Sequence, residues 1–186
     1  MGQKYAAYDA SGTLAGFYDS VDSPVPDGVS VVEITDAEWL TAIQTGAIGY
    51  TVVGGALTPP AAKTDAELLA DAQATQKSTL YASCAAAIVD GFTSDALGTS
   101  HNYPSAVTDQ QNQNSVANST AGGLLWCETG DVWSFSQHTQ AQAQTVVSDF
   151  AVWLNACQSQ LVTLSASVAA ATTVAAVQAI VWANPS

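Results

Sequence analysis

The sequence predicts an α+β fold, in which a small N-terminal β-hairpin/helix unit precedes a mainly helical region with an inserted β-hairpin. Short β-branched and aromatic runs alternate with turn residues up to the proline pair at 59–60, which is typical of small sheets. From Thr64 the chain becomes rich in alanine and follows long helical repeats. Two aromatic runs near 124–135 interrupt these helices around a glycine turn. We therefore expect one domain over residues 1–60 and a second over residues 61–186.

Turn residues divide the N-terminal domain into short elements. Apolar runs on both sides of the Asp9–Gly12 turn are typical of a hairpin, and Gly54 with Gly55 marks a second one. The expected elements are a hairpin over 4–19, a strand over 29–34, a helix over 35–46 that ends at Gly46, and a hairpin over 49–60.

The C-terminal region contains two long helices with mixed elements between them. In the second of these helices, apolar residues recur at three- and four-residue steps from Val146 to Leu161, which indicates one buried face. Tyr103 precedes Pro104, which favours an extended backbone there. The expected elements are a helix over 64–90, a short β segment with its turn at Gly98, a polar helix near 108–121, a hairpin that turns at Thr129, Gly130 and Asp131, a helix that starts at 139, and a last helix over 172–182 with Val174, Val177 and Val181 on one side.

Four predicted helix starts carry a capping box, in which a threonine and a Glu or Gln three residues later each bond the other's backbone amide. The four boxes are Thr35–Glu38, Thr64–Glu67, Thr108–Gln111 and Thr139–Gln142. These boxes give the amide-rich stretch around residue 110 a local structural role. His138 directly precedes the last box, and we expect it to pack there.

One face of the helix over 64–90 mixes leucine with glutamine. Leu69, Gln73, Gln76 and Leu80 lie near this face. A polar layer within an apolar stripe can set the register between copies of a helix, which makes these four residues candidates for an interface in a homo-oligomer. A helix at the edge of a monomer, with a partly wet face, explains the same stripe. The sequence leaves both interpretations open.

The charge balance excludes several classes of partner. The chain has 16 acidic residues against three lysines and no arginine, for a net charge of -13. A protein that binds phosphate groups needs cations at the contact, so neither nucleic acid nor an anionic membrane surface is an expected partner. No stretch approaches the apolar length of a transmembrane helix, so membrane insertion is not expected either.

The residue types of a cysteine-nucleophile site are present, but their spacing does not indicate one. His101, Asp109, Cys127 and His138 could in principle form such a set. Cys127 lies in an apolar run, however, where burial would raise the thiol pKa. The two histidines are far apart and match no metal-ligand spacing. We therefore expect no enzyme activity, no metal and no cofactor, and we treat His101 and Tyr103 as further candidate interface residues.

Several short motifs follow one another in a recognisable order. The stretches DGFTSDALG, HNYPSAVTDQQNQ, LLWCETGDVW, HTQAQ and AATTVAAVQAIVW lie within residues 85–183. Together they resemble a C-terminal domain of uncharacterised function that is common in bacteriophage tail proteins. The earlier stretches YDASGTLAGFYDS, VPDGVSVVEITDAEW and GALTPP look like the opening of phage tail-fibre assembly and accessory proteins. Those families offer no catalytic residues to transfer, and the acidic, arginine-free second half of this chain departs from the fibre-assembly type.

The resemblance implies a structural component of a phage tail, such as a fibre, baseplate or fibre-attachment protein, that acts through contacts with other tail proteins. It also implies synthesis in the bacterial host cytoplasm, residence in the virion and a homo-oligomer, with a trimer favoured by fibre symmetry. One alternative is a chaperone that assembles the fibre and then leaves. Another is a host-surface receptor- or glycan-binding protein whose exposed aromatics, such as Trp126, Trp133 or Tyr103, stack on sugars. We assign these three mainly to the core, because large aromatic side chains usually bury most of their surface.

Overall fold

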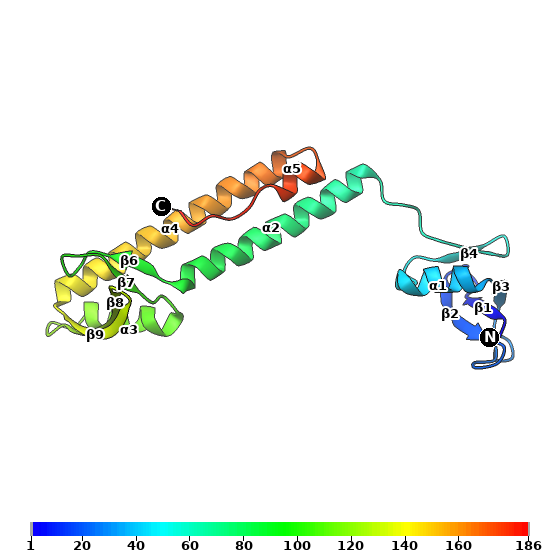
Figure 1. The fold of residues 1–186 in the computed structure, drawn as a ribbon, viewed down its shortest axis with the longest axis horizontal. Coiled ribbons are helices and arrows are strands. Elements are labelled where there is room, and N and C mark those ends of the chain that lie inside the picture. The colour runs from blue at the N-terminus through cyan, green and yellow to red at the C-terminus, as the bar shows by residue number, and fades with distance from the viewer. Residues whose placement is uncertain (1, 186) are drawn as a thin grey trace. The chain divides into compact units, whose positions relative to one another are not determined.

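The computed structural model describes residues 2–185, along which helices and strands are mixed (Figure 1). The α+β fold class predicted from the sequence is confirmed. Contacts between residues divide the chain into two compact units, unit 1 over Met1–Lys63 and unit 2 over Thr64–Ser186. The division falls just after the proline pair at 59–60.

Unit 1 is built on a three-stranded antiparallel sheet. Its elements are β1 (Lys4–Tyr8), β2 (Leu14–Asp19), β3 (Val31–Ile34), α1 (Asp36–Gln44), β4 (Thr51–Val53) and β5 (Ala56–Thr58), with the sheet order β2-β1-β3 and a separate β4-β5 hairpin. These elements enclose a core of Ala6, Ile34, Ala42, Tyr50, Val52 and Leu57. Gly12 has a φ of 82°, and a Cβ there would lie 2.8 Å from the Val52 carbonyl oxygen. The first hairpin turn therefore needs glycine to approach β4.

A buried ion pair joins β1 to β2 in unit 1. Lys4 Nζ donates to the carboxylate of Asp19 and also lies 4.6 Å from the ring centroid of Trp39. The hydrogen bond from Lys4 is the main reason that the pKa of Asp19 lies well below its ordinary value of 3.8. One of the three lysines of the chain is thus committed to the fold of unit 1.

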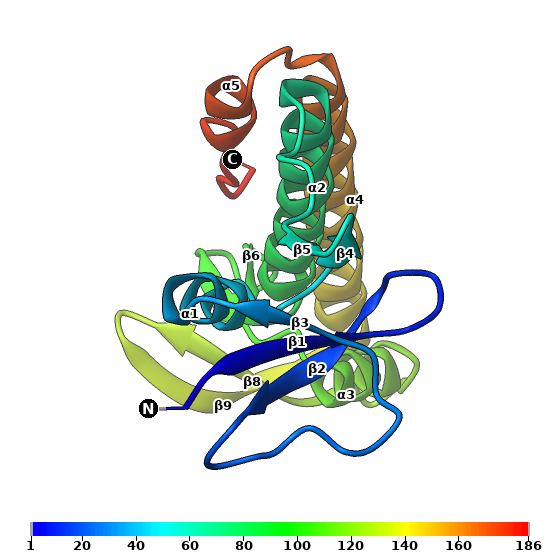
Figure 2. The same ribbon diagram turned by 90° about the vertical axis from the view of Figure 1, so that its right-hand side faces the viewer.

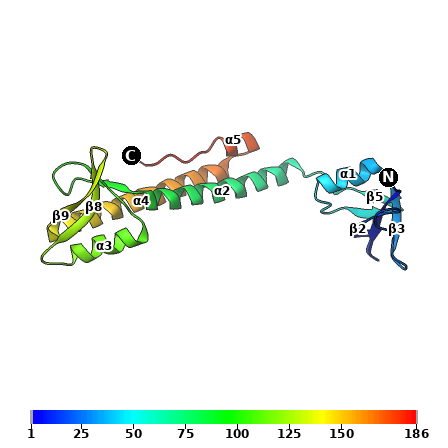
Figure 3. The same cartoon turned by 60° about the horizontal axis from the view of Figure 1, so that its bottom comes forward.

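Unit 2 combines two long helices with a four-stranded antiparallel sheet. Its elements are α2 (Asp65–Asp90), β6 (Phe92–Ser94), β7 (His101–Tyr103), α3 (Val107–Ala117), β8 (Gly123–Thr129), β9 (Val132–His138), α4 (Gln140–Ala170) and α5 (Val174–Gln178), with the sheet order β6-β7-β8-β9. Helices α2 and α4 lie side by side (Figure 2). The β8–β9 hairpin and α3 gather at the end of this pair where α4 begins (Figure 3).

The leucines of the predicted Leu/Gln stripe lie in the core between the long helices. Leu80 is buried together with Val168 and Val177, and Leu69 packs against the same cluster. Further along the two helices, a second cluster contains Cys84, Ala87 and Cys157. Both clusters mix large with small side chains, which lets the helices approach closely.

The glutamines of the stripe also have partners in the same chain. Gln73 Nε2 donates to the Ala171 carbonyl at 3.0 Å, and Gln76 Nε2 donates to the Ile180 carbonyl. Both carbonyls lie outside the helices, so the glutamines satisfy backbone groups that lack a helical donor. The polar layer that suggested an interface between copies therefore stabilises a contact within one chain.

Three of the four predicted capping boxes are confirmed. At Thr35, Thr64 and Thr139 the threonine and the residue three positions later make both reciprocal bonds. The box predicted at Thr108 is wrong, because α3 starts earlier, after Ala106, and Ala106 makes no side-chain cap bond.

Side-chain hydrogen bonds hold the backbone that leads into α3. Ser105 Oγ donates to the Ile88 carbonyl at 2.7 Å and anchors the chain just before the helix. Within α3, Gln110 Nε2 donates to the Ser105 carbonyl and Gln113 Nε2 donates to the Pro104 carbonyl, each at 2.8 Å. The amide-rich stretch thus holds the incoming backbone in place of a threonine cap.

The last predicted helix is shorter than expected. The segment predicted over 172–182 forms a helix only at α5, and Val181 is 66% exposed instead of sharing a buried face with Val177. Beyond α5, Ile180 and Trp182 pack against the clusters between α2 and α4. These contacts favour an extended chain along the helix pair over another helical turn.

Candidate functional site

Tyr103 and His138 form a fully buried pair in unit 2. The Tyr103 hydroxyl oxygen lies 2.8 Å from His138 Nε2, and His138 Nδ1 lies 2.9 Å from the Ser136 carbonyl oxygen. A carbonyl oxygen only accepts hydrogen bonds, so Nδ1 carries the ring proton and Nε2 accepts the proton of the Tyr103 hydroxyl. The pair ties β7 to the end of β9.

Burial keeps both members of this pair neutral. Desolvation is the main cause that lowers the pKa of His138 below 6.5 and raises the pKa of Tyr103 far above 10. His101, 9% exposed, has its own local partner, because its Nδ1 lies 2.7 Å from the Thr99 carbonyl oxygen. His101 and Tyr103, which were candidates for an interface, thus have partners inside the chain.

The residues of the cysteine-nucleophile set do not assemble into a reactive site. Cys127 is 1% exposed and lies in the core cluster with Tyr103, whereas Asp109 lines a hollow on the surface. Within residues 2–185, no three His, Cys, Asp or Glu side chains converge in a way that could hold a metal ion. In that same part of the chain, no helix has the length and apolar character needed to cross a bilayer.

The outer face of the β8–β9 hairpin carries a cluster of exposed apolar side chains, which we call the aromatic face. Its members are Leu124, Trp126, Trp133 and Phe135. Trp126 and Trp133 are each 41% exposed, and Phe135 is 64% exposed. The assignment of these two tryptophans to the core is therefore wrong, whereas Tyr103 is buried as predicted.

Strand register brings the aromatic rings together. Trp126 pairs with Phe135 and Glu128 pairs with Trp133, so these four side chains point to the same side of the hairpin. The rings of Trp126 and Trp133 stack with centroids 6.4 Å apart and planes 17° apart. Phe135 meets Trp126 edge-on, with centroids 4.8 Å apart. Both are favourable ring geometries, so the aromatic face is ordered by its own contacts.

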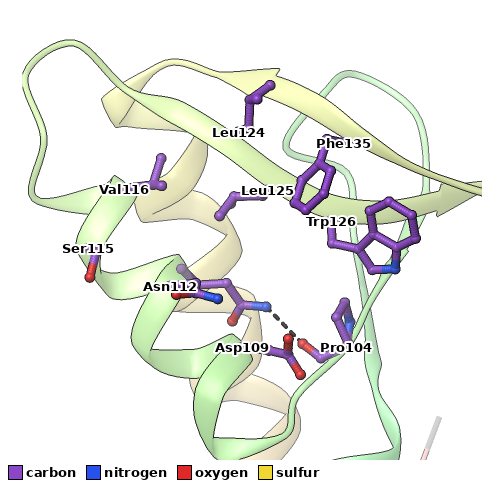
Figure 4. A pocket seen from close by; sticks show the side chains of 10 residues that line it. Pro104, Asp109, Asn112, Ser115, Val116, Leu124, Leu125, Trp126 and Phe135 are labelled. Atoms are coloured by element: carbon purple, nitrogen blue, oxygen red, sulfur yellow. Dashed lines mark hydrogen bonds between the residues drawn. The ribbon is translucent and has the colours of Figure 1, made fainter.

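A hollow of about 330 Å³ opens beside the aromatic face (Figure 4). Strands β7 and β8 pair only at Asn102 and Glu128, after which the chain leaves the sheet at Pro104 and forms α3. Helix α3 then takes the place of β7 beside β8, and a helix cannot lie as close to a strand as another strand does. The hollow is lined by Pro104, by Asp109, Asn112, Gln113, Ser115 and Val116 of α3, and by Leu124, Leu125, Trp126 and Phe135 of the hairpin.

The polar groups around the aromatic face are carboxylates and amides. Glu128 accepts a hydrogen bond of 2.9 Å from Asn102 Nδ2, Asp109 lines the hollow, and Asp131 forms the hairpin turn. No lysine or arginine follows Lys77 in the sequence. Ring faces and carboxylates both attract cations, so this surface suits a basic or neutral partner and disfavours an anionic one.

The sequence contains a signal for the aromatic face in the alternation of β9. His138 is the buried end of β9, and side chains alternate between the two faces of a strand. Steps of two residues from His138 place Ser136 and Ser134 on the inner face and Phe135 with Trp133 on the outer face. A structural role for His138 would therefore have predicted exposed rings.

A scan against models of known protein families finds no match. Searches of curated protein sequences and of solved structures find no significant match either. The resemblance to phage tail proteins therefore stays a prediction.

Proposed function

We propose that this chain is a structural component of a bacteriophage tail, as a fibre, baseplate or fibre-attachment protein that acts through protein-protein contacts. It would be made in the bacterial host cytoplasm and reside in the virion. The observation that carries the proposal is the aromatic face on a unit whose histidines and cysteines are committed to its core. Aromatic residues are enriched at protein interfaces, where they supply large apolar contact areas. The order of the tail-like motifs in the sequence agrees with this role.

Self-association belongs to the proposal, with a trimer favoured because tail fibres have threefold symmetry. Its support has to come from surfaces other than the stripe of Leu69, Gln73, Gln76 and Leu80, since all four have partners within the chain. Sedimentation velocity at micromolar concentration decides the point. A single species with the mass of one chain would remove self-association and leave the tail role in place.

The copy number of the chain in purified phage particles tests the proposed function. A structural component is present in a fixed ratio to the known tail proteins, and quantitative gel densitometry of purified virions measures this ratio. Absence from particles whose fibres nevertheless require the gene would favour the alternative, a fibre-assembly chaperone. Absence with no effect on the particles would contradict both roles.

A host-surface glycan is a second candidate partner, because Trp126 and Trp133 offer stacked and partly exposed rings. A glycan array with the full chain tests this candidate. Binding that Trp126→Ala abolishes would support it, and binding unchanged by that variant would remove it from the aromatic face.

A further inference from the structure

β9 is an edge strand without the usual protection against further pairing. All seven of its residues pair with β8 in an unbroken register, and among the described residues of unit 2 no strand pairs with its other side. Its sequence, VWSFSQH, has neither a lysine nor a proline, the residues that commonly block an exposed edge. The opposite edge strand, β6, is only three residues long and packs against α4. The β9 edge is therefore the side of this sheet that can accept another strand.

The side chains of β9 suit packing against an added strand. On the outer face, Phe135 is 64% exposed and Trp133 stacks on Trp126, which pairs with Phe135. Val132, which is 63% exposed, lies on the opposite face of the strand. In β-strand addition, backbone bonds supply affinity and alternate side chains supply specificity. Apolar residues of a bound strand would lie beside these exposed groups.

Charge restricts the identity of the occupant. Glu128 lies on the same side of the hairpin as the aromatic face, Asp131 forms the hairpin turn and Asp109 lines the adjacent hollow. A second copy of unit 2 would bring the same carboxylates to the contact and no cation beyond Lys77. Lysine or arginine side chains on a different partner would meet both the ring faces and the carboxylates.

We propose that the β9 edge binds an extended basic segment of a partner protein by β-strand addition. Its basic side chains would lie over the aromatic face and toward Glu128 and Asp131, and its backbone would pair with β9. This inference rests on the proposed function, because it gives a surface and a partner chemistry to the protein-protein contacts proposed above. A sugar would use the rings but leave the unpaired backbone groups of β9 unexplained.

A synthetic peptide of alternating lysine and valine, as long as β9, is the probe. The full chain is titrated with this peptide, and binding is followed by tryptophan fluorescence and calorimetry. Two control peptides separate the contributions. One is N-methylated on every backbone amide, which keeps its side chains and charge but removes its backbone donors, and the other replaces lysine with glutamate. We expect both controls to bind at least roughly tenfold more weakly, equivalent to the loss of about 1.4 kcal/mol.

Variants of the chain locate the site. Phe135→Ser and Glu128→Gln should each weaken peptide binding several-fold, whereas Tyr81→Ala, at a 69% exposed aromatic on α2, should leave it unchanged. Unfolding curves that match the parent chain show that the variants remain folded.

Several results would overturn the inference. They are no binding of the lysine peptide, equal binding of the N-methylated peptide, and equal binding by the Phe135→Ser variant. Displacement of the peptide by maltotriose would also overturn it. So would a dimer of the chain that forms through β9 and blocks peptide binding. None of these results affects the tail role itself, which the copy number in virions decides.

Discussion

Both faces of the β8–β9 hairpin carry apolar side chains, but those of the inner face beside α4 are buried and those of the outer face are exposed. On the inner face, Leu125, Cys127 and His138 are at most 2% exposed, whereas Trp126 and Phe135 on the outer face are 41% and 64% exposed. The inner face packs against α4 through Ala143 and Val146, whereas Trp126, Trp133 and Phe135 on the outer face stay exposed. The difference shows that burial here follows the placement of α4 and not the hydrophobicity of the side chains. Apolar groups left uncovered are the ones to examine for a partner.

The largest expected difference between the faces lies at two adjacent leucines. Leu125→Ala should lower the free energy of unfolding of unit 2 by about 2–5 kcal/mol, because it leaves a cavity in a packed core. Leu124→Ala, at a position that is 57% exposed, should cost well under half as much. Urea unfolding followed by tryptophan fluorescence measures both, since four of the five tryptophans belong to unit 2. Equal losses for the two variants would contradict the assignment of inner and outer faces.

The second-largest loss of stability is expected from breaking the buried Tyr103–His138 pair. Tyr103→Phe keeps the ring but leaves His138 Nε2 buried without a donor, which should cost about 1–3 kcal/mol. Tyr81→Phe makes the same chemical change at a side chain that is 69% exposed and should be nearly neutral. Thermal unfolding by circular dichroism compares the two. If Tyr103→Phe leaves the stability unchanged, the hydrogen bond to His138 does not contribute to the free energy of unfolding.

Acid should lower the free energy of unfolding of unit 2 in a defined pH window. The folded-state pKa of His138 is lower than its unfolded value near 6.5, so the unfolded chain binds a proton first. The stability of unit 2 should therefore be complete above about pH 6.5 and fall as the pH drops below it, by at most about 1.4 kcal/mol per pH unit. Asp19 of unit 1 has an ordinary pKa of 3.8 that is lowered in the fold, so its contribution is lost only in stronger acid. Urea unfolding between pH 7 and pH 5 measures the slope, and a His138→Gln variant should flatten it.

The smallest effect compares two threonines that the sequence marked as equivalent caps. Thr139 follows the buried His138 and caps α4, so Thr139→Ala should cost about 1 kcal/mol. Thr108 lies inside the first turn of α3 and caps nothing, so Thr108→Ala should cost no more than a few tenths. Chemical denaturation of the two variants side by side distinguishes them. A larger loss of stability for Thr108→Ala than for Thr139→Ala would contradict the start of α3 after Ala106.

Local chemistry explains which parts of the fold the sequence predicted. The caps at Thr35, Thr64 and Thr139 depend on residues three positions apart, so they were visible in the sequence. The start of α3 was missed because Ser105 is fixed by Ile88, which lies in another helix. A sequence pattern cannot reveal such a distant contact.

The residues of the candidate site could not be predicted for the same reason, because their surroundings depend on contacts that are distant in the sequence. Gln73 and Gln76 carried a correct polar signal, but their acceptors lie about 100 residues away and could equally have belonged to another chain. Trp126 and Trp133 carried a correct β-strand signal. Which face of that hairpin α4 would cover was not encoded in either strand alone.

The placement of the lysines has a practical consequence for finding this chain in a particle. Trypsin cleaves after lysine and arginine, and here Lys4 lies in a buried ion pair, Lys63 ends unit 1 and Lys77 lies within α2. Residues 78–186 contain no site for trypsin, so digestion leaves them in one fragment that is too long for routine peptide mass spectrometry. A virion survey based on trypsin would therefore undercount the chain even at full stoichiometry. A protease that cleaves at aspartate and glutamate, which are spread along both units, would release peptides that can be counted.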